Sequence, residues 1–277
     1  MQSIMWKPGR ERVENSQMTA FIYYVNNHFS IQLENYSQLY NWSIEKNEEF
    51  WEAFWEYSNI IHHSYYREVV DDKYKMPGAK WFKGATLNFA ENLLQYKNDQ
   101  IAIRFCSEDG TKSTLTYNEL YNRVAGLATA LKKWGITKGD RVCGFLPNIP
   151  ETIIAMLAST SIGAIWSSCS PDFGIQGVLD RFKQIEPKII FTADGYKYNG
   201  KVINLLSKLK GILSELHSIK TTVIIPFILN GKEDKISNSI LWNDFIDQCV
   251  TEISFEKLSF DYPLYIMYSS GTTGLPK

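Results

Sequence analysis

Small hydroxylated residues and glycines gather in one short segment whose chemistry suits a phosphate group. The string YSSGTTGLPK covers residues 268–277 and follows an apolar run, residues 264–267, that predicts a β-strand. Gly271 and Gly274 let the backbone adopt conformations that other residues rarely adopt, so successive amide N–H groups can converge on one anion. Side-chain hydroxyl and ammonium groups add further donors, from Ser269, Ser270, Thr272, Thr273 and Lys277.

The spacing of this segment excludes a Walker A loop. That loop has the pattern G-x-x-x-x-G-K-[ST], in which a second glycine stands five positions after the first. Five positions after Gly271 the sequence has Pro276. A bare pair of glycines is common in turns, so the prediction of a phosphate-binding loop depends on the whole string from Tyr268 to Lys277.

The elements that must position this loop alternate between strands and helices. Continuous apolar runs predict strands at residues 101–106, 113–117, 141–147, 164–169, 188–193, 221–227 and 264–267. Amphipathic patterns predict helices at residues 117–134, 150–162, 173–185, 202–216 and 242–249. This alternation predicts an α/β fold with a mostly parallel, helix-covered sheet. Ligands of such sheets bind beyond the carboxyl ends of strands, which is where the loop stands.

Two local signals mark boundaries inside this region. The Asp109-Gly110 pair between the first two strands predicts a hairpin. Thr116 and Glu119 have the spacing of a capping box at the start of the first helix, and Gly135 ends that helix.

The first hundred residues predict a separate helical cap. One helix begins at Asn15 or Ser16, a second covers residues 43–57, and a third, short one covers residues 88–95, after an irregular stretch at residues 71–84. The second helix carries an aromatic stripe that we expect to dock on the main domain: Phe50, Trp51, Phe54 and Trp55. The expected domains are residues 1–100, the cap, and residues 101–277, the α/β region.

The composition argues against polyanionic partners. The chain has 29 basic and 30 acidic residues, a net charge of −1, so no global basic excess favours nucleic acid or an anionic membrane. The N-terminus lacks the apolar core of a secretory signal. The longest uncharged stretch, residues 152–171, contains several serines and predicts a buried helix, turn and strand rather than a membrane span.

The cysteines and histidines show no metal-ligand or disulfide spacing. Four cysteines and four histidines are scattered along the chain without a CxxC pair. We expect reduced core thiols in a cytoplasmic protein, and the adjacent pair His62-His63 is expected to be structural or at the surface.

The string YSSGTTGLPK resembles the signature phosphate loop of the AMP-forming acyl-CoA synthetases and their adenylating relatives. That signature has the form [YF]-[ST]-S-G-[ST]-T-G-x-P-K, and every defined position is matched here. Upstream, KGDRVCGFLPNIPETIIAMLASTSIGAIWSSCSPDFG and DRFKQIEPKIIFTADGYKYNGK look like further blocks of that family. The cap, with FWEAFWEYSNI and AKWFKGATLNFAENLL, is similar to the acetyl-CoA synthetase branch, and the opening WKPGRERVENSQMTAF most resembles its acetoacetyl-CoA synthetases.

The resemblance implies an adenylate-forming fold and a two-step reaction. A carboxylate attacks the α-phosphate of ATP and expels pyrophosphate, and the thiol of CoA then displaces AMP. It implies that residues of the loop bind the β- and γ-phosphates of ATP: Ser269, Ser270, Gly271, Thr272, Thr273, Gly274 and Lys277. Among these, the resemblance assigns catalytic roles to Thr272, Thr273 and Lys277.

A second segment is similar to the family's CoA-binding turn. Acetyl-CoA synthetases have an R-x-G-[RK] turn that helps to hold the CoA nucleotide, and residues 198–201 stand at the matching place. Gly200 and Lys201 fit the pattern, whereas Tyr198 replaces the arginine. The alternative is a solvent-exposed turn between a strand and a helix.

The remaining functional parts are expected beyond Lys277. They include the adenine contacts, the acidic Mg²⁺ ligand, most of the acyl pocket and a mobile domain with the adenylation lysine. The first hypothesis is therefore a truncated acetoacetate–CoA ligase, inactive alone, with the missing C-terminal part or a second copy as its partner. The alternatives are a non-catalytic nucleotide-binding or subunit-interaction module, and a ligase for acetate or propionate.

Overall fold

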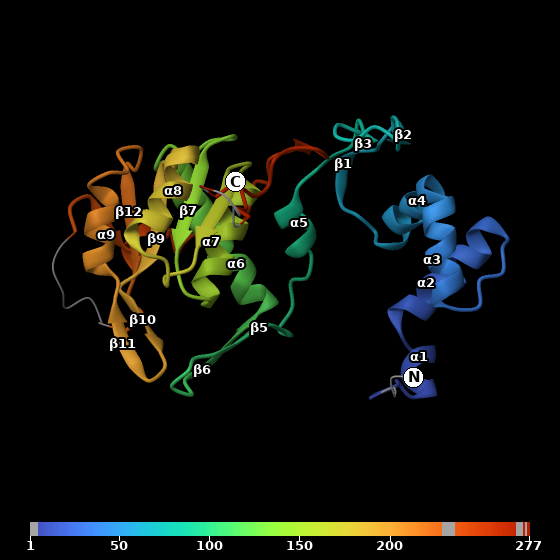
Figure 1. Cartoon of the computed structure of the whole chain (residues 1–277), viewed down its shortest axis with the longest axis horizontal. Helices are drawn as coiled ribbons and strands as arrows, with labels where there is room; N and C mark the ends of the chain where they lie inside the picture. Colours follow the sequence, from blue (N-terminus) through green and yellow to red (C-terminus); the bar gives the residue numbers. More distant parts are fainter. Residues whose placement is uncertain (1–4, 229–235, 270–273, 275) are drawn as a thin grey trace. The chain divides into compact units, whose positions relative to one another are not determined.

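The computed structural model describes residues 5–228, 236–269, 274 and 276–277. The chain divides into two compact units, Met1–Ala85 and Thr86–Lys277 (Figure 1). The boundary expected at residue 100 from the sequence stays a prediction.

The first unit is built on four helices. They are α1 (Arg10–Glu14), α2 (Gln17–Phe29), α3 (Tyr36–Glu45) and α4 (Asn47–Tyr57). The start of α2 is as predicted, because the Ser16 hydroxyl accepts a hydrogen bond from the Thr19 amide at 3.1 Å.

The prediction of a single helix at residues 43–57 is wrong. Two helices, α3 and α4, meet at Lys46, whose φ of −114° and ψ of 51° lie outside the helical region. The bend brings apolar rings of both helices into one core: the rings of Trp42 and Phe50 lie 6.2 Å apart. A single straight helix would instead have had the polar residues 45–49 in its middle. These residues would have made no apolar contacts to stabilise it.

The aromatic stripe of α4 builds the core of its own unit. The rings of Phe50 and Phe54 both meet the ring of Phe21 edge-on at 5.9 Å. The ring of Trp55 stacks on that of Phe82 at 4.6 Å. These contacts account for most of the stripe, and docking of its exposed parts on the main domain stays a prediction.

Three short strands complete the first unit. They are β1 (His62–Ser64), β2 (Glu68–Val70) and β3 (Trp81–Lys83). Strands β2 and β3 pair antiparallel, with Val70 opposite Trp81. The stretch predicted as irregular at residues 71–84 is therefore a loop that ends in a strand.

The second unit contains the predicted parallel sheet. Its five strands lie in the order β13 (Ser239–Leu241), β12 (Thr221–Ile225), β9 (Ile189–Ala193), β7 (Arg141–Phe145) and β8 (Ile165–Cys169). All four neighbouring pairs are parallel. The sequence predicted all of these strands except β13.

Helices cover both faces of this sheet. They are α6 (Tyr117–Lys133), α7 (Pro150–Ser161), α8 (Ile175–Ile185) and α9 (Leu206–Leu213). The chain crosses from β7 to β8 through α7, and in the opposite direction from β8 to β9 through α8. Because such crossovers are right-handed, α7 and α8 lie on opposite faces. Helix α6 packs on α7, and α9 packs on α8 (Figure 1).

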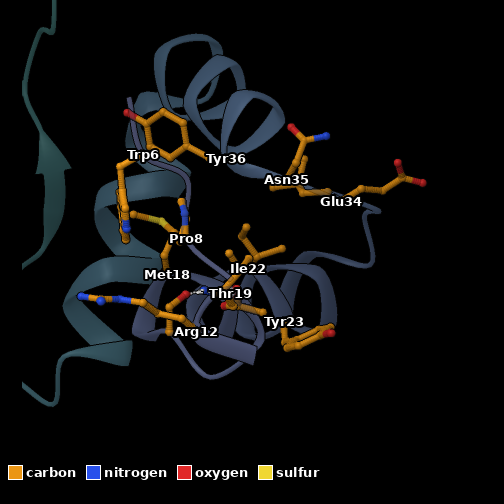
Figure 2. Close-up of a pocket in the computed structure, with 13 residues that line it drawn as sticks. Trp6, Pro8, Arg12, Met18, Thr19, Ile22, Tyr23, Glu34, Asn35 and Tyr36 are labelled. Atoms are coloured by element: carbon orange, nitrogen blue, oxygen red, sulfur yellow. Dashed lines mark hydrogen bonds between the residues drawn. The ribbon is translucent and has the colours of Figure 1, made fainter. Parts of the chain in front are cut away.

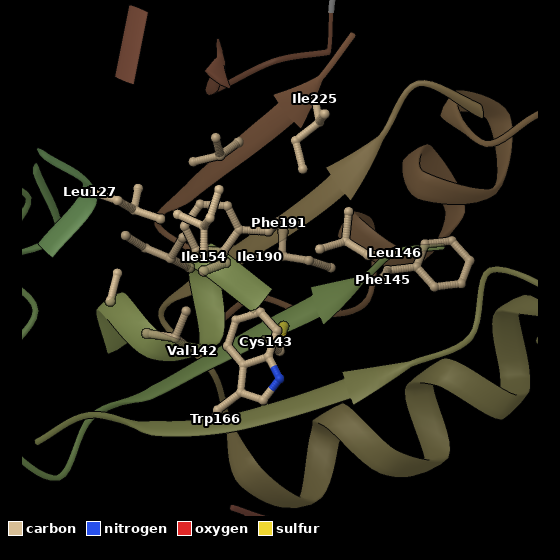
Figure 3. Packing of buried hydrophobic residues seen from close by; sticks show 14 of the residues in the cluster. Leu127, Val142, Cys143, Phe145, Leu146, Ile154, Trp166, Ile190, Phe191 and Ile225 are labelled. Atoms are coloured by element: carbon tan, nitrogen blue, oxygen red, sulfur yellow. The ribbon is translucent and has the colours of Figure 1, made fainter. Parts of the chain in front are cut away.

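The core lies where the central strands meet these helices. Figure 3 shows Cys143 and Phe145 of β7 beside Trp166 of β8 and Phe191 of β9. All four side chains are buried, and burying each large one stabilises the fold by about 1.5–3 kcal/mol. Trp166, which we expected to be structural although it is near the candidate site in the sequence, is buried in this core.

The predicted boundary signals of this unit are confirmed. Strands β5 (Ile101–Cys106) and β6 (Lys112–Thr116) form the antiparallel hairpin, and Gly110 at its turn has φ of +83°. The Thr116 hydroxyl accepts from the Glu119 amide, and the Glu119 carboxylate accepts from the Thr116 amide, so the capping box is complete. The short helix α5 (Phe89–Leu93) begins after Asn88.

The helix predicted at residues 202–216 begins later than expected. A second hairpin occupies its start, with β10 (Gly195–Tyr198) antiparallel to β11 (Lys201–Asn204). Asn199 and Gly200 join the strands with φ of 49° and 71°, the positive values that a tight two-residue hairpin turn requires. This turn chemistry, which we missed in the sequence, overrides the helical spacing that begins at Val202.

The last elements of the unit are short. Strand β4 (Thr86–Leu87) pairs antiparallel with β14 (Leu258–Ser259). Helix α10 (Trp242–Phe245) ends four residues before the predicted boundary at residue 249. Beyond it, the Asp247 carboxylate accepts from the Cys249 amide, so the backbone bonds locally instead of continuing the helix.

Candidate functional site

The segment before the candidate loop lies beside the edge strand β8. The Trp166 amide donates to the Leu264 carbonyl at 3.1 Å, and the Ile266 amide donates to the Trp166 carbonyl at 2.9 Å. The Ser167 hydroxyl also donates to the Ile266 carbonyl at 2.9 Å. The sequence predicted a full strand here, whereas the described residues form one parallel bridge, Trp166 to Tyr265.

Tyr268 anchors the start of the loop on α8. Its hydroxyl donates to the Arg181 carbonyl at 2.7 Å. Burial is the main cause that raises the pKa of Tyr268 to about 12. The phenol is therefore protonated at neutral pH and remains a hydrogen-bond donor.

The two ends of the loop are tied to each other. The Ser269 amide donates to the Lys277 main-chain oxygen at 2.9 Å, and the Lys277 amide donates to the Ser269 carbonyl at 3.4 Å. The Ser269 hydroxyl donates to the same Lys277 oxygen at 3.2 Å. These hydrogen bonds join the two ends of the string at Ser269 and Lys277.

The described part of the loop is open to solvent. Ser269, Gly274 and Lys277 are all exposed. No heavy atom of the described residues lies within 4 Å of the position that a Cβ on Gly274 would occupy. The other predicted ligands, Ser270, Gly271, Thr272 and Thr273, lie outside the described residues, so their roles stay predictions.

Two residues of α8 that we did not predict as site residues support the loop. The Gln184 side chain donates to the Pro276 carbonyl at 3.0 Å, and Arg181 accepts from Tyr268 through its carbonyl. Their spacing of three places both residues on one face of the helix. That spacing was visible in the sequence, but its target was not, because the loop is about ninety positions away.

The predicted CoA turn lies at the tip of the β10–β11 hairpin. It joins two strands, so the alternative of a strand-to-helix turn is wrong, and the CoA-binding role stays a prediction. Gly200 has open space around it, and Lys201 is exposed.

Carboxylates lie next to this turn. The Lys197 ammonium pairs with Asp109, and the Asn199 amide donates to the Glu108 carboxylate at 2.7 Å. The bond from Lys197 is the largest cause that holds the pKa of Asp109 below its usual range. Lys197 neutralises one of these carboxylates, so groups of both charges lie beside the turn.

A turn after β8 connects the neighbourhood of the loop with the hairpin. The Tyr196 hydroxyl donates to the Asp172 carboxylate at 2.8 Å, and the Ser170 hydroxyl donates to its other oxygen at 3.0 Å. Burial, reinforced by the bond to Asp172, raises the pKa of Tyr196 to about 12. These contacts fix the base of the β10–β11 hairpin against the start of α8.

A separate cavity of about 660 Å³ lies in the first unit. Figure 2 shows Trp6, Met18 and Tyr36 around it, together with the side chains of Arg12 and Tyr23. Its lining contains none of the residues predicted from the sequence, so it does not belong to the loop site.

The described residues add two observations. They contain no cluster of three or more histidine, cysteine, aspartate or glutamate residues that could hold a metal ion. None of the helices in the described ranges has both the length and the apolar character needed to cross a membrane.

Comparisons with known proteins match nearly the whole chain. The family model described as AMP-binding enzyme matches residues 89–277, and the model described as acetyl-coenzyme A synthetase N-terminus matches residues 36–93. The acetoacetyl-CoA synthetase of Gallus gallus is 46% identical over 286 aligned residues, which cover 99% of this chain and 42% of the relative. The acetoacetyl-coenzyme A synthetase of Rhizobium meliloti (strain 1021) is 43% identical, with the same two coverages.

A solved structure supports the same relationship. The acetoacetyl-CoA synthetase from Streptomyces lividans matches with a TM-score of 0.92 and 36% identity, over 99% of this chain and 42% of that chain. This chain therefore spans about two fifths of the length of the relatives that it matches.

Proposed function

Because the chain belongs to the AMP-binding enzyme family, we propose that it is the N-terminal portion of an ATP-dependent acetoacetate–CoA ligase. The observation that carries the proposal is the similarity of 99% of the chain to acetoacetyl-CoA synthetases. The position of the string supports it, because it follows a segment that bridges in parallel to β8, and ligands of such folds bind beyond the carboxyl ends of strands.

The proposed reaction has two steps. A carboxylate oxygen of acetoacetate attacks the α-phosphorus of ATP, the bond to the bridging oxygen breaks, and pyrophosphate leaves with the electron pair. The thiolate of CoA then attacks the acyl carbon and AMP leaves, giving acetoacetyl-CoA. Such displacements require orientation of the reactants and stabilisation of charge more than a covalent nucleophile from the protein.

We assign the loop to the leaving pyrophosphate. Backbone amides at Gly271 and Gly274 and the hydroxyls of Thr272 and Thr273 supply hydrogen bonds, and Lys277 supplies a positive charge. Each donor directed at developing charge contributes about 3 kcal/mol in comparable sites. The bonds between Ser269 and Lys277 support this assignment, because a closed loop loses little further conformational entropy when phosphate binds.

Mg²⁺ would neutralise charge on the triphosphate when bound. From the resemblance of the chain to the family, we propose that the acidic ligand of this ion lies in the longer protein. We retain Gly200 and Lys201 as candidate CoA contacts, beside Glu108 and the Lys197–Asp109 ion pair.

We also propose a cellular compartment for the protein. All four cysteines are free thiols, which supports a reducing compartment and hence the cytoplasm. Self-association stays a prediction.

Isotope exchange between pyrophosphate and ATP tests the function. We expect the longer protein to catalyse this exchange with acetoacetate more efficiently than with acetate or propionate. We expect the chain of 277 residues alone to catalyse none. A preference for acetate or propionate would contradict the assignment of the acid but keep the reaction class.

Calorimetry separates the ligase fragment from a binding module. Titration of ATP and of CoA into the chain of 277 residues should give no measurable heat of binding. Binding at micromolar concentration would instead support a non-catalytic nucleotide-binding module.

A further inference from the structure

Helix α8 has two faces with different roles. Its apolar face is buried in the core of the second unit and consists of Val178, Leu179, Phe182 and Ile185. A second stripe contains Gly177, Arg181 and Gln184, whose spacings of four and three place them on one side of the helix. This stripe is directed at the candidate loop.

The stripe holds both ends of the loop. At the start, the Tyr268 hydroxyl donates to the Arg181 carbonyl at 2.7 Å. At the end, the Gln184 side chain donates to the Pro276 carbonyl at 3.0 Å. One rigid turn of helix therefore contacts the chain on both sides of residues 269–275.

The guanidinium of Arg181 lies between two aromatic rings. Its central carbon is 4.4 Å from the centre of the Phe173 ring and 5.8 Å from the centre of the Tyr268 ring. Nη1 donates to the Gly177 carbonyl at 2.7 Å, which fixes the orientation of the side chain. Both ring distances are within the range of cation–π attraction.

The charge of Arg181 is not neutralised by an acid. Among the described residues, no carboxylate lies within ion-pair distance of its guanidinium. A guanidinium has five donors, and the hydrogen bonds of the described residues use one of them, toward Gly177. A half-buried cation with unused donors beside a phosphate-binding loop favours an anion there.

We propose that Arg181 is a positioning residue of this loop. It holds the ring of Tyr268, and so fixes the direction in which the chain leaves the sheet, and its positive charge favours phosphate oxygens in the loop. The ligand class is the triphosphate of ATP or the pyrophosphate released from it. This inference rests on the proposed function only for the identity of the ligand.

Three variants of the longer protein test the role of the charge. Arg181→Met keeps an unbranched side chain against both rings but removes the charge, and Arg181→Lys restores the charge without the planar group. Arg104→Met is the control, because Arg104 is an exposed arginine on β5 in the same unit.

We expect Arg181→Met to change the KM for ATP and no other kinetic constant by more than about twofold. In the exchange assay, Arg181→Met should raise the KM for ATP about tenfold. The KM for acetoacetate and the kcat should stay within about twofold of wild type, and Arg104→Met should change nothing. Arg181→Lys should recover part of the loss. If Arg181→Met and Arg181→Lys lower kcat equally and leave the KM for ATP unchanged, the charge has no such role and the inference is overturned.

A second measurement does not depend on catalysis. Hydrogen exchange of the peptide containing residues 264–277, measured in the chain of 277 residues, reports on the amides of Ser269 and Lys277 that close the loop. Arg181→Met and Gln184→Ala should each accelerate this exchange at least about threefold, while Arg104→Met should not.

Unchanged exchange in both α8 variants would refute the positioning role, even if the proposed ligase activity were found. If the longer protein activates no acid, the proposed function fails, and this measurement still decides whether Arg181 positions the loop.

Discussion

At the scale of single residues, the site depends on a tyrosine that is kept protonated. Tyr268 lies where the chain leaves the edge of the sheet, and its hydroxyl needs its proton to donate to the Arg181 carbonyl. Burial favours that neutral form by raising its pKa to about 12, two units above an ordinary tyrosine. Because burial raises this pKa, the free energy of unfolding depends on pH in the alkaline range.

Tyr268→Phe should lower the free energy of unfolding by about 1 kcal/mol at pH 7, because one hydrogen bond is lost. The pKa of the folded protein is the raised one, so the stabilisation is complete below pH 10, the ordinary value. It then falls as pH rises from about 10 to about 12, and the difference between wild type and variant should shrink over that interval. Urea denaturation at pH 7, 10 and 11 measures this. Tyr198→Phe is the control, since Tyr198 is 61% exposed.

Gly274→Ala should leave the free energy of unfolding within about 0.5 kcal/mol of wild type. A Cβ there would meet no atom of the described part of the chain within 4 Å, and the φ of Gly274 is not in the left-handed region. Gly126→Ala is the matched contrast, because its Cβ would lie 2.4 Å from the backbone carbonyl oxygen of Asp247. That variant should lose about 1–3 kcal/mol in the same denaturation experiment. A destabilisation by Gly274→Ala as large as that of Gly126→Ala would contradict the open geometry of the loop.

At the scale of elements, two parts of the second unit have different electrostatic surroundings. Helix α8 offers the loop a cation that no described carboxylate neutralises. The β10–β11 hairpin offers Lys201 next to a turn that carries Asp109 and Glu108. Two segments that both looked suited to phosphate in the sequence therefore differ once their neighbours are known.

Gly200→Ala should destabilise the hairpin by about 1 kcal/mol, because Gly200 has φ of +71° and a Cβ is disfavoured there. The loss comes from backbone strain, since no atom is within 4 Å. Thermal denaturation of the chain of 277 residues should show it as a lower Tm. Gly174→Ala is the control, because Gly174 has equally open space and an ordinary φ of −68°. Equal effects of the two substitutions would argue against the strained turn.

At the scale of the whole molecule, each compact unit has its own hydrophobic core. One cluster in the first unit centres on Phe21, Val25, Leu39 and Trp42, and the large cluster of the second unit centres on the sheet. Separate cores predict separate responses to core mutations.

Phe21→Ala should lower the stability of the first unit by about 3–5 kcal/mol, because its ring contacts Phe50, Phe54 and Tyr57. Phe191→Ala should do the same to the second unit, where Phe191 is fully buried. Hydrogen exchange followed by peptide analysis should show each loss within residues 1–85 or residues 86–277 only. If either variant accelerated exchange equally in both units, the cores would not be independent.

The sequence by itself determined the features that depend on neighbouring residues. Alternating apolar runs fixed the parallel strands and most helices, and the Thr116–Glu119 capping box needed only its own four residues. The string from Tyr268 to Lys277 predicted a loop with phosphate chemistry for the same reason: its donors are adjacent in the chain. Where local signals competed, as at Lys46 and at the Asn199–Gly200 turn, the helical pattern gave the wrong result.

Only the tertiary structure decided what surrounds those features. The pairing of Tyr268 with Arg181 joins positions 87 apart, and that of Gln184 with Pro276 joins positions 92 apart. Both follow from the order of the strands, which brings residues 264–266 to the edge of β8 and the loop onto α8. Asp109 and Lys197, which pair across two separate hairpins, are likewise 88 positions apart. No spacing in the sequence encodes such contacts, because they arise from the path of the chain through space.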